Sequence, residues 1–147
     1  MPLAWEKSLS VGVPELDAQH REIIARLRML GEAIGLDRRG ATAETLRGLL
    51  ECLALHFEAE ERFMREQAHP HLRAHSRAHK LGMETLERAA QLLADDGPTA
   101  RFLELTERSA RWLEVHLRSE DLRLGMFRET QRRRRAPPVS KPKGRGG

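Results

Sequence analysis

The residues best suited to chemistry in this chain are histidines and carboxylates that recur at helical spacing. In the stretch HFEAEERFM, residues 56–64, His56 and Glu60 lie four positions apart. On an α-helix a step of four residues turns about 400°, so the two side chains lie about 40° apart on one face, one turn above the other. Such a pair can bind one metal ion together, although a single pair is more often a surface ion pair or a buried histidine that contacts a carboxylate. The other histidines must decide between these interpretations.

Three further stretches with a helical pattern carry residues of the same kinds. His75 and His79 are also four apart, His116 precedes Asp121 by five positions, and His20 lies in the first stretch. In antiparallel neighbouring helices these groups can meet at one level of a bundle, whereas unrelated surface residues would scatter around and along the helices. The distribution of these residues therefore indicates a metal site to which all four helices contribute.

Two other kinds of metal site are not supported by the sequence. Ferritin-like oxidases need two Glu-x-x-His units with further glutamates, and only Glu66 and His69 have this spacing, across a predicted turn. Zinc hydrolases typically use H-E-x-x-H or clustered cysteines, and the chain has neither. His69 and His71, which flank Pro70, are expected to be solvated turn residues.

The elements that must position these residues are helices. Charged residues make up 33% of the 147 residues, aromatic residues only 4%, and there is no tyrosine, a composition that favours a helical protein. Apolar residues recur at threes and fours in four stretches, which run from Glu15 to about Leu36, from a Thr42 N-cap to about Gln67, from about Pro70 to Ala94, and from about Thr99 to Glu129. Short turns between helices force alternating directions. We therefore expect an all-α fold, an antiparallel up-down-up-down four-helix bundle with an N-terminal arm.

The charge of the chain is distributed unevenly. Residues 132–147 contain seven of the 26 basic residues and none of the 22 acidic ones, so the rest of the chain carries three more acidic than basic residues. The net charge of +4 therefore reflects an appended segment rather than a basic folded surface. We expect a bundle domain over residues 1–131 and a basic, Pro- and Gly-rich disordered tail over residues 132–147.

The cellular setting is read from what the sequence lacks. The single Cys52 excludes an internal disulfide, and the first thirty residues have no apolar run of the signal-peptide type. No stretch of about eighteen apolar residues is present, so a membrane span is not expected. These features predict a cytoplasmic protein.

In chain order, His, H-x-x-x-E, H-x-x-x-H and H-x-x-x-x-D resemble the di-iron signature of the hemerythrin family, and point to its single-domain bacterial members. The flanking residues agree with it: Trp5, VGVPELDAQH at 11–20, HFEAEERFM at 56–64, Pro70, and WLEVHLRSED at 112–121. The resemblance extends from Trp5 to about Phe127. One departure is His69, because the family commonly has tyrosine before this proline.

The resemblance implies a cofactor of two iron ions joined by an oxo or hydroxo bridge. One iron would be bound by His75, His79 and His116, the other by His20 and His56, and Glu60 and Asp121 would bridge the two. These groups and the solvent-derived bridge fill all but one position on two octahedral metals. The open position lies on the iron with two histidines, where the family places dioxygen. Leu113 and Trp112 would line the oxygen pocket, although ordinary core packing also explains both.

The resemblance further implies a non-haem oxygen-binding protein rather than an enzyme. It would bind O₂ reversibly at the open position for storage, transport or delivery. Two alternatives stay open: a module that senses O₂ or nitric oxide through a separate partner protein, and a di-iron peroxidase or nitric-oxide reductase. We expect a monomer without a membrane partner, and no nucleic-acid partner unless the basic tail provides for one.

The spacing between His116 and Asp121 raises a geometric problem for this ligand set. Five residues of regular α-helix turn about 500°, which would leave the two side chains about 140° apart. One π-helical turn, with about 4.4 residues per turn, would reduce the mismatch to about 50° and is frequent at functional sites. We therefore predict a distorted i→i+5 turn between residues 116 and 121, or an unusually extended Asp121 side chain.

Overall fold

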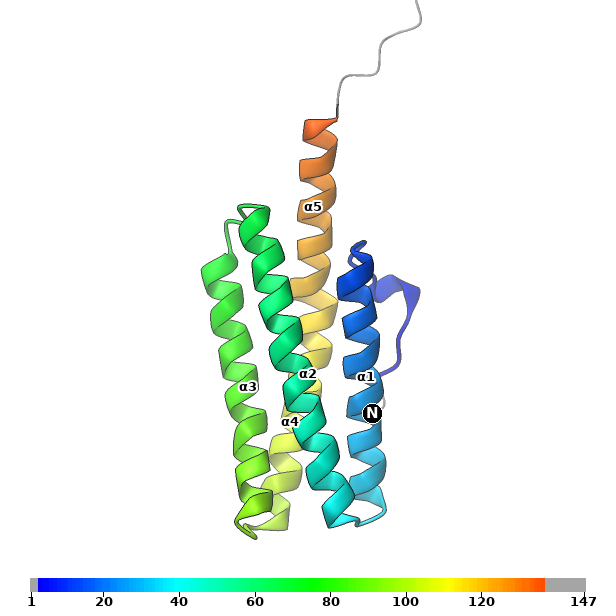
Figure 1. Ribbon diagram of the computed structural model, residues 1–147, viewed down its shortest axis with the longest axis vertical. Coiled ribbons are helices and arrows are strands. Elements are labelled where there is room, and N and C mark those ends of the chain that lie inside the picture. The colour runs from blue at the N-terminus through cyan, green and yellow to red at the C-terminus, as the bar shows by residue number, and fades with distance from the viewer. Residues whose placement is uncertain (1–2, 137–147) are drawn as a thin grey trace, which may run out of the picture.

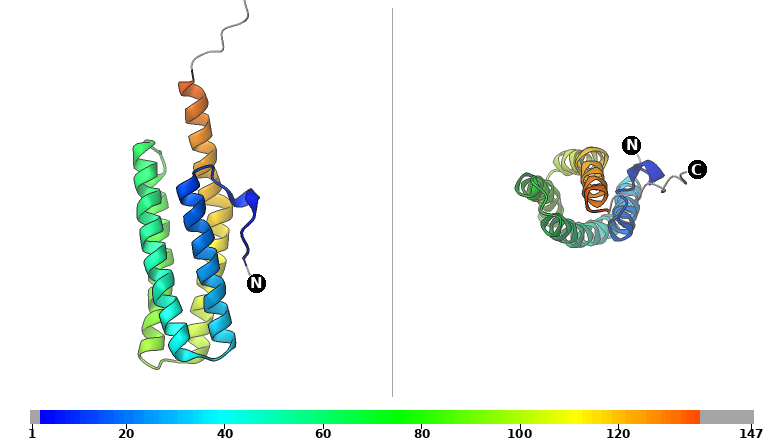
Figure 2. Two further views of the ribbon diagram at one scale, coloured as in Figure 1. Left: turned by 45° about the vertical axis from the view of Figure 1, so that its right-hand side comes forward. Right: turned by 90° about the horizontal axis from the view of Figure 1, so that it is seen from above.

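Four helical rods form an antiparallel up-down-up-down bundle in the computed structural model, which describes residues 3–136 (Figure 1). The rods are α1 (Pro14–Gly35), α2 (Arg39–Glu66), α3 (Leu72–Ala94), and a fourth rod composed of α4 (Thr99–His116), the π-helical segment η2 (Leu117–Asp121) and α5 (Leu122–Arg135). Seen from above, the rods surround a common interior, and the side view shows that α5 extends beyond the other helices (Figure 2). The predicted fold class is confirmed. None of the described helices has the length and hydrophobicity needed to span a lipid bilayer.

The three turns between rods share one backbone conformation. Each contains a residue in the left-handed region, namely Asp37, Ala68 and Asp96. In each turn the next N–H donates to a carbonyl five residues back, in the pairs Arg38 to Ala33, His69 to Met64, and Gly97 to Leu92. This hydrogen bond is typical of the Schellman motif, which satisfies the free carbonyls at the end of a helix and reverses the chain within a few residues. Short turns of this kind make successive rods antiparallel neighbours.

Two predicted helix ends were wrong. Helix α2 begins at Arg39, not at a Thr42 cap, because the Thr42 hydroxyl donates back to the Arg38 carbonyl at 2.8 Å from within the helix. Helix α5 ends at Arg135, past the end predicted near Glu129, so Arg132–Arg135 are helical. Glu129 and Arg133 form an ion pair at 3.3 Å there, and basic residues in a last turn complement the helix dipole. The remainder of the expected tail, residues 137–147, lies outside the described residues.

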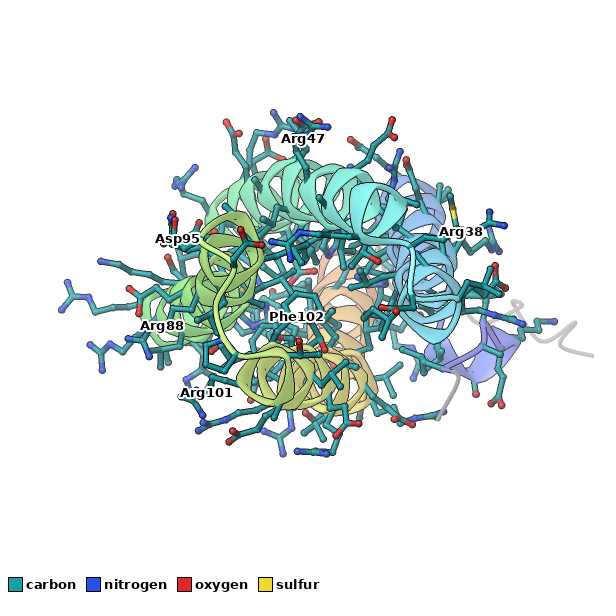
Figure 3. The ribbon with its side chains drawn as sticks, turned by 90° about the horizontal axis from the view of Figure 1, so that it is seen from below. Arg38, Arg47, Arg88, Asp95, Arg101 and Phe102 are labelled. Carbon is teal, nitrogen blue, oxygen red and sulfur yellow. The ribbon has the colours of Figure 1, made fainter. Side chains whose placement is uncertain are left out.

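A hydrophobic cluster fills the half of the bundle nearest the α1–α2 and α3–α4 turns. Its buried members are Ile23, Leu30, Leu46, Leu49, Leu53, Phe57, Leu86, Ala89, Phe102, Leu105 and Leu113. Viewed from this end, Phe102 points into the bundle while the labelled arginines point outward (Figure 3). The apolar stripes that predicted the helices therefore meet in one core.

The N-terminal arm packs along the outside of the first and fourth rods. It contains a short 3-10 turn, η1 (Lys7–Leu9), and its Leu3 and Leu9 form a buried cluster with Ile24 and Leu117. The arm crosses α5 at Gly125, where a Cβ atom would lie 2.5 Å from the Val11 carbonyl oxygen, so only glycine permits this approach. Because Leu117 is the first residue of η2, the arm also supports the π-helical segment.

Candidate metal centre

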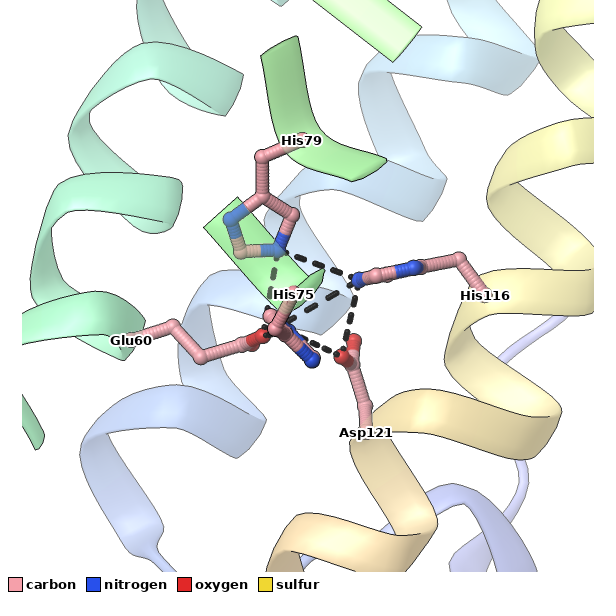
Figure 4. Close-up of side chains that lie close together, drawn as sticks. All are labelled: Glu60, His75, His79, His116 and Asp121. Atoms are coloured by element: carbon pink, nitrogen blue, oxygen red, sulfur yellow. Dashed lines mark hydrogen bonds and ion pairs between the residues drawn. The ribbon is translucent and has the colours of Figure 1, made fainter. Parts of the chain in front are cut away.

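The seven predicted ligands converge in the interior of the other half of the bundle. They come from all four rods, and none exposes more than 4% of its surface: His20, His56, Glu60, His75, His79, His116 and Asp121. Figure 4 shows five of them pointing toward one another from α2, α3 and the fourth rod. The structure therefore brings together every residue that the spacing singled out.

These side chains form two groups that share both carboxylates. In the first group, the candidate ligand atoms of Glu60, His75, His79, His116 and Asp121 lie within 4.8 Å of one another, and in the second, those of His20, His56, Glu60 and Asp121 do so. The three-histidine group and the two-histidine group, as we call them below, correspond to the division of histidines that the family resemblance implies. Whether each group binds a metal ion stays a prediction.

Each carboxylate directs one oxygen toward each group. Glu60 Oε1 contacts Nε2 of His75 and lies 3.2 Å from Nε2 of His79, while Oε2 lies 3.0 Å from Nε2 of His56. Asp121 Oδ1 lies 3.0 Å from Nε2 of His116, and Oδ2 lies 3.2 Å from Nε2 of His20. A carboxylate placed in this way can contribute one oxygen to each of two neighbouring cations.

The π-helical segment accounts for the position of Asp121. Segment η2 spans Leu117–Asp121, directly after His116, and Asp121 is 1% exposed. The wider turn reduces the rotation between the two side chains, so that both face the interior (Figure 4). The predicted i→i+5 distortion is confirmed, and with it a reason for the five-residue spacing.

Several buried polar atoms in the cluster form no hydrogen bond among the described residues, although imidazole nitrogens lie 3.0–3.2 Å from both carboxylates. They are Glu60 Oε2, both carboxylate oxygens of Asp121, and His20 Nδ1. Burial of an ionised carboxylate without compensation costs several kcal/mol. Pairs of imidazole nitrogens also face each other, with His20 Nε2 3.0 Å from His56 Nε2 and His79 Nε2 3.1 Å from His116 Nε2. Cations between these atoms would satisfy them, and imidazole with carboxylate is a donor set suited to divalent iron and similar metals.

The charges within the cluster are strongly perturbed. Burial lowers the pKa of His20, but its contacts with Asp121 and Glu60 outweigh burial and raise this pKa to about 9. For His56 burial prevails over the contact with Glu60 and lowers the pKa. Burial raises the pKa of Glu60, yet the surrounding histidines outweigh it and hold this pKa well below the usual range. The contacts with Asp121 and Glu60 therefore favour the protonated form of His20, whose positive charge offsets part of the carboxylate charge.

Three polar residues behind the imidazoles escaped the sequence analysis. Gln19 Oε1 lies 2.7 Å from His56 Nδ1, Glu61 Oε2 lies 3.4 Å from His79 Nδ1, and Glu120 Oε2 lies 3.6 Å from His75 Nδ1. Partners of this kind orient metal-binding imidazoles and fix which nitrogen carries the proton. One signal in the sequence could have found them, because each is the immediate neighbour of a predicted ligand, His20, Glu60 or Asp121.

Two aromatic rings cover histidines of the three-histidine group. Phe57 stacks on His79 with ring centroids 3.9 Å apart, and Trp112 stacks on His116 at 4.8 Å. Gly82 of α3 makes room for Trp112, because a Cβ at this glycine would lie 2.5 Å from the indole ring. Trp112 therefore lies at the contact of α3 with α4, against His116.

Three other residues that the sequence analysis named, Leu113, Trp5 and His69, are not among the converging side chains. Leu113 is buried in the hydrophobic cluster, one turn before His116. Trp5 packs outside the bundle, with the Arg21 guanidinium 4.7 Å from its ring. His69 contacts the Phe127 ring near the α2–α3 turn and is not among the converging residues. An oxygen pocket lined by Leu113 and Trp112 stays a prediction.

Comparisons with known proteins agree with this arrangement. The family model described as the hemerythrin HHE cation binding domain matches residues 11–127, which include all seven converging residues. The chain is 30% identical over 125 residues to a bacteriohemerythrin of Stenotrophomonas maltophilia (strain R551-3), covering 81% of this chain and 76% of that protein. A bacteriohemerythrin of Pseudomonas paraeruginosa (strain DSM 24068 / PA7) is 29% identical over 122 residues, with coverage of 81% and 76%. The myohemerythrin of Theromyzon tessulatum is 22% identical over 122 residues, covering 83% of this chain and 90% of its own.

Proposed function

We propose that this chain, which belongs to the hemerythrin family, binds two iron ions and takes up O₂ reversibly for oxygen storage, transport or delivery. The observation that carries this proposal is the orientation of Glu60 and Asp121. In each carboxylate, one oxygen faces the three-histidine group and the other faces the two-histidine group. One iron would be bound by the three-histidine group and the other by the two-histidine group, with both carboxylates as bridges. Two ferrous ions held in this way would supply the two electrons transferred to O₂ on binding and would regain them on release.

The unequal number of histidines supports the two-histidine group as the place where the gas would bind. The two groups share the same carboxylates, so the two-histidine group offers its metal one ligand fewer. An external ligand would therefore bind on the side of His20 and His56. This assignment agrees with the family resemblance and makes these two histidines the residues nearest to dioxygen.

The residues beneath the cluster favour release of dioxygen over its reduction. Ile23, Leu53 and Leu113, each three residues from a histidine of the cluster, belong to the buried hydrophobic cluster, and Phe57 adjoins His56. These four side chains offer no hydroxyl or thiol proton to a bound gas molecule. Their apolar surface also excludes water, which limits loss of electrons from the centre. We therefore favour a carrier over the di-iron peroxidase or nitric-oxide reductase alternatives.

The proposal is tested by loading the metal-free protein with ferrous iron without oxygen and then cycling it between air and argon. We expect two irons per chain and a visible absorption band that appears in air and is lost under argon over repeated cycles. Two bound irons without an oxygen-dependent band would contradict oxygen binding. Steady consumption of O₂ with an added reductant would identify an enzyme instead, and a His20→Ala variant serves as the control that loses the gas-binding side.

A further inference from the structure

The outer nitrogens of the imidazoles have partners of different charge in the two groups. In the three-histidine group, the carboxylate of Glu61 lies behind His79 and that of Glu120 behind His75. In the two-histidine group, the neutral amide of Gln19 lies behind His56, and His20 Nδ1 has no partner among the described residues. The two groups thus differ in the charge behind their ligands as well as in the number of histidines.

This difference changes how strongly each group can bind a cation. A carboxylate that accepts the Nδ1 proton of an imidazole keeps the Nε2 lone pair directed at the metal and makes the ring a better donor. A neutral amide can hold the same orientation but adds no negative charge. The three-histidine group should therefore hold a divalent cation more tightly than the ligand count alone predicts.

Glu61 is placed to exert the larger part of this effect. Its side chain is 21% exposed, compared with 43% for Glu120, so water screens its charge less. Its carboxylate oxygen is also closer to its imidazole, at 3.4 Å compared with 3.6 Å. Glu61 therefore is the stronger candidate for tuning the three-histidine group.

A surface cavity connects this residue with solvent. The cavity lies between α2 and α3 and has a volume of about 480 Å³. Besides Glu61 and His79, its lining includes two further acidic residues, Glu58 and Glu87, and three basic ones, Arg62, Arg65 and Lys80. His79 thus contacts the ligand cluster with Nε2 and borders the cavity on its other side. A cation arriving through this cavity would meet Glu61 and His79 before it reached the two-histidine group.

We infer that Glu61 positions His79 and makes the three-histidine group the first of the two to take up a metal ion. The inference rests on the ligand assignment of the proposed function, and adds an order of loading and the residue that controls it. Glu61 acts through His79 and is not itself a ligand. Two observations support it, the contact of Glu61 with Nδ1 of His79 and the cavity that both residues line.

The test is a titration of the metal-free, full-length protein with Co²⁺, followed by its visible absorption. Wild-type protein should bind the first equivalent at least about tenfold more tightly than the second. Glu61→Ala should weaken the first step by about 10- to 100-fold, the usual effect of losing such an outer partner. Glu61→Gln, which keeps the acceptor oxygen but removes the charge, should give a smaller loss, and both variants should leave the second step nearly unchanged.

Three matched variants fix the interpretation. Glu58→Gln makes the same charge change at an exposed position of the same cavity and should leave both steps as in wild type. Gln19→Glu places a carboxylate behind His56 and should strengthen the second step. His20→Ala should lose the weaker step alone, which assigns the tighter step to the three-histidine group. Histidine ¹⁵N spectra should also show the His79 proton on Nδ1 in wild type and a mixture of tautomers in Glu61→Ala.

The inference is overturned if Glu61→Ala changes the first step by less than about threefold, if Glu58→Gln weakens it equally, or if His20→Ala removes the tighter step. Far-ultraviolet circular dichroism of the metal-free variants establishes whether they fold. If Glu61→Ala is unfolded, the titration of Glu61→Gln provides the test instead. A protein that loads Co²⁺ in the expected order but whose iron form does not bind O₂ would refute the proposed function alone. Reversible oxygen binding with the opposite loading order would refute this inference alone.

Discussion

The two halves of the bundle are stabilised by different means. The half near the α1–α2 and α3–α4 turns is filled by aliphatic and aromatic side chains such as Leu49, which is 0% exposed. The other half places histidines and carboxylates at an equivalent depth, and several of their buried atoms have no hydrogen-bond partner among the described residues. Apolar burial stabilises the first half in any solution, whereas the second half combines a smaller apolar cluster around Leu16, Met64 and Leu124 with polar atoms whose contribution depends on what they bind.

This difference teaches that fold and site are separable parts of one helical pattern. The same inward stripe carries Leu53 and then His56 on α2, and Leu113 and then His116 on the fourth rod. The leucines require only a dry and well-packed neighbourhood. The histidines require a cation or protons, so we expect the bundle to fold without metal and to gain local stability when metal binds.

Removal of metal should produce the largest loss of stability, and this loss should be confined to the half of the bundle that contains the histidines. Each ion held at a thousandfold excess over its Kd should stabilise the protein by about 4 kcal/mol. After chelation, hydrogen exchange should accelerate in η2 and in the first turns of α3, which contain Asp121 and His75, and remain slow around Leu49. Equal acceleration in both halves would show that the halves are not separable.

Truncation of the apolar core should reverse this pattern. Leu49→Ala should lower the free energy of unfolding by about 2–5 kcal/mol, because it removes buried methyl groups and leaves a cavity. The loss should be similar with and without metal, and the number of metal ions per chain should not change. Denaturant unfolding and metal analysis measure both quantities, and a loss of bound metal would contradict the separation.

Gly82 offers a smaller perturbation at the boundary between the two halves. Gly82→Ala should destabilise the protein by about 1–3 kcal/mol, because the new methyl group would push Trp112 away from His116. In a Trp5→Phe background the emission of Trp112 should shift to the red as the ring becomes more exposed. Gly31→Ala is the control, since a Cβ there meets no atom within 4 Å, and it should stabilise α1 by about 0.5–1 kcal/mol. Equal effects of the two substitutions would contradict the role of Gly82.

The basic end of the chain should matter least to either half. Ending the chain after Gln131 removes Arg132–Arg135 and the residues beyond them. Because these arginines are exposed, the free energy of unfolding should change by less than about 0.5 kcal/mol, and oxygen binding should be unaffected. Loss of oxygen binding on truncation would show that the functional unit extends past the boundary at residue 131.

The sequence predicted the bundle and the convergence of its ligands for a common reason. Both depend on helical periodicity, which places His56 and Glu60 on one face whatever the details of packing. The π-helical turn was also predictable, because a five-residue spacing cannot direct both His116 and Asp121 inward on a regular helix.

Features that depend on tertiary contacts were not predictable in the same way. The start of α2 was misplaced because Thr42 forms a hydrogen bond within the helix, a choice that its residue type does not reveal. Glu61 is one of many glutamates in α2, and only the position of α3 brings His79 beside it. The close approach of Gly82 and Trp112 likewise exists only once α3 and α4 have packed.

The most direct test of the account is an anomalous-diffraction map of crystals of the iron-loaded protein. The account predicts two iron peaks per chain, one within the three-histidine group and one within the two-histidine group, both in contact with Glu60 and Asp121. A single peak, or two peaks of which one lies away from these carboxylates, would contradict a centre shared by all four rods.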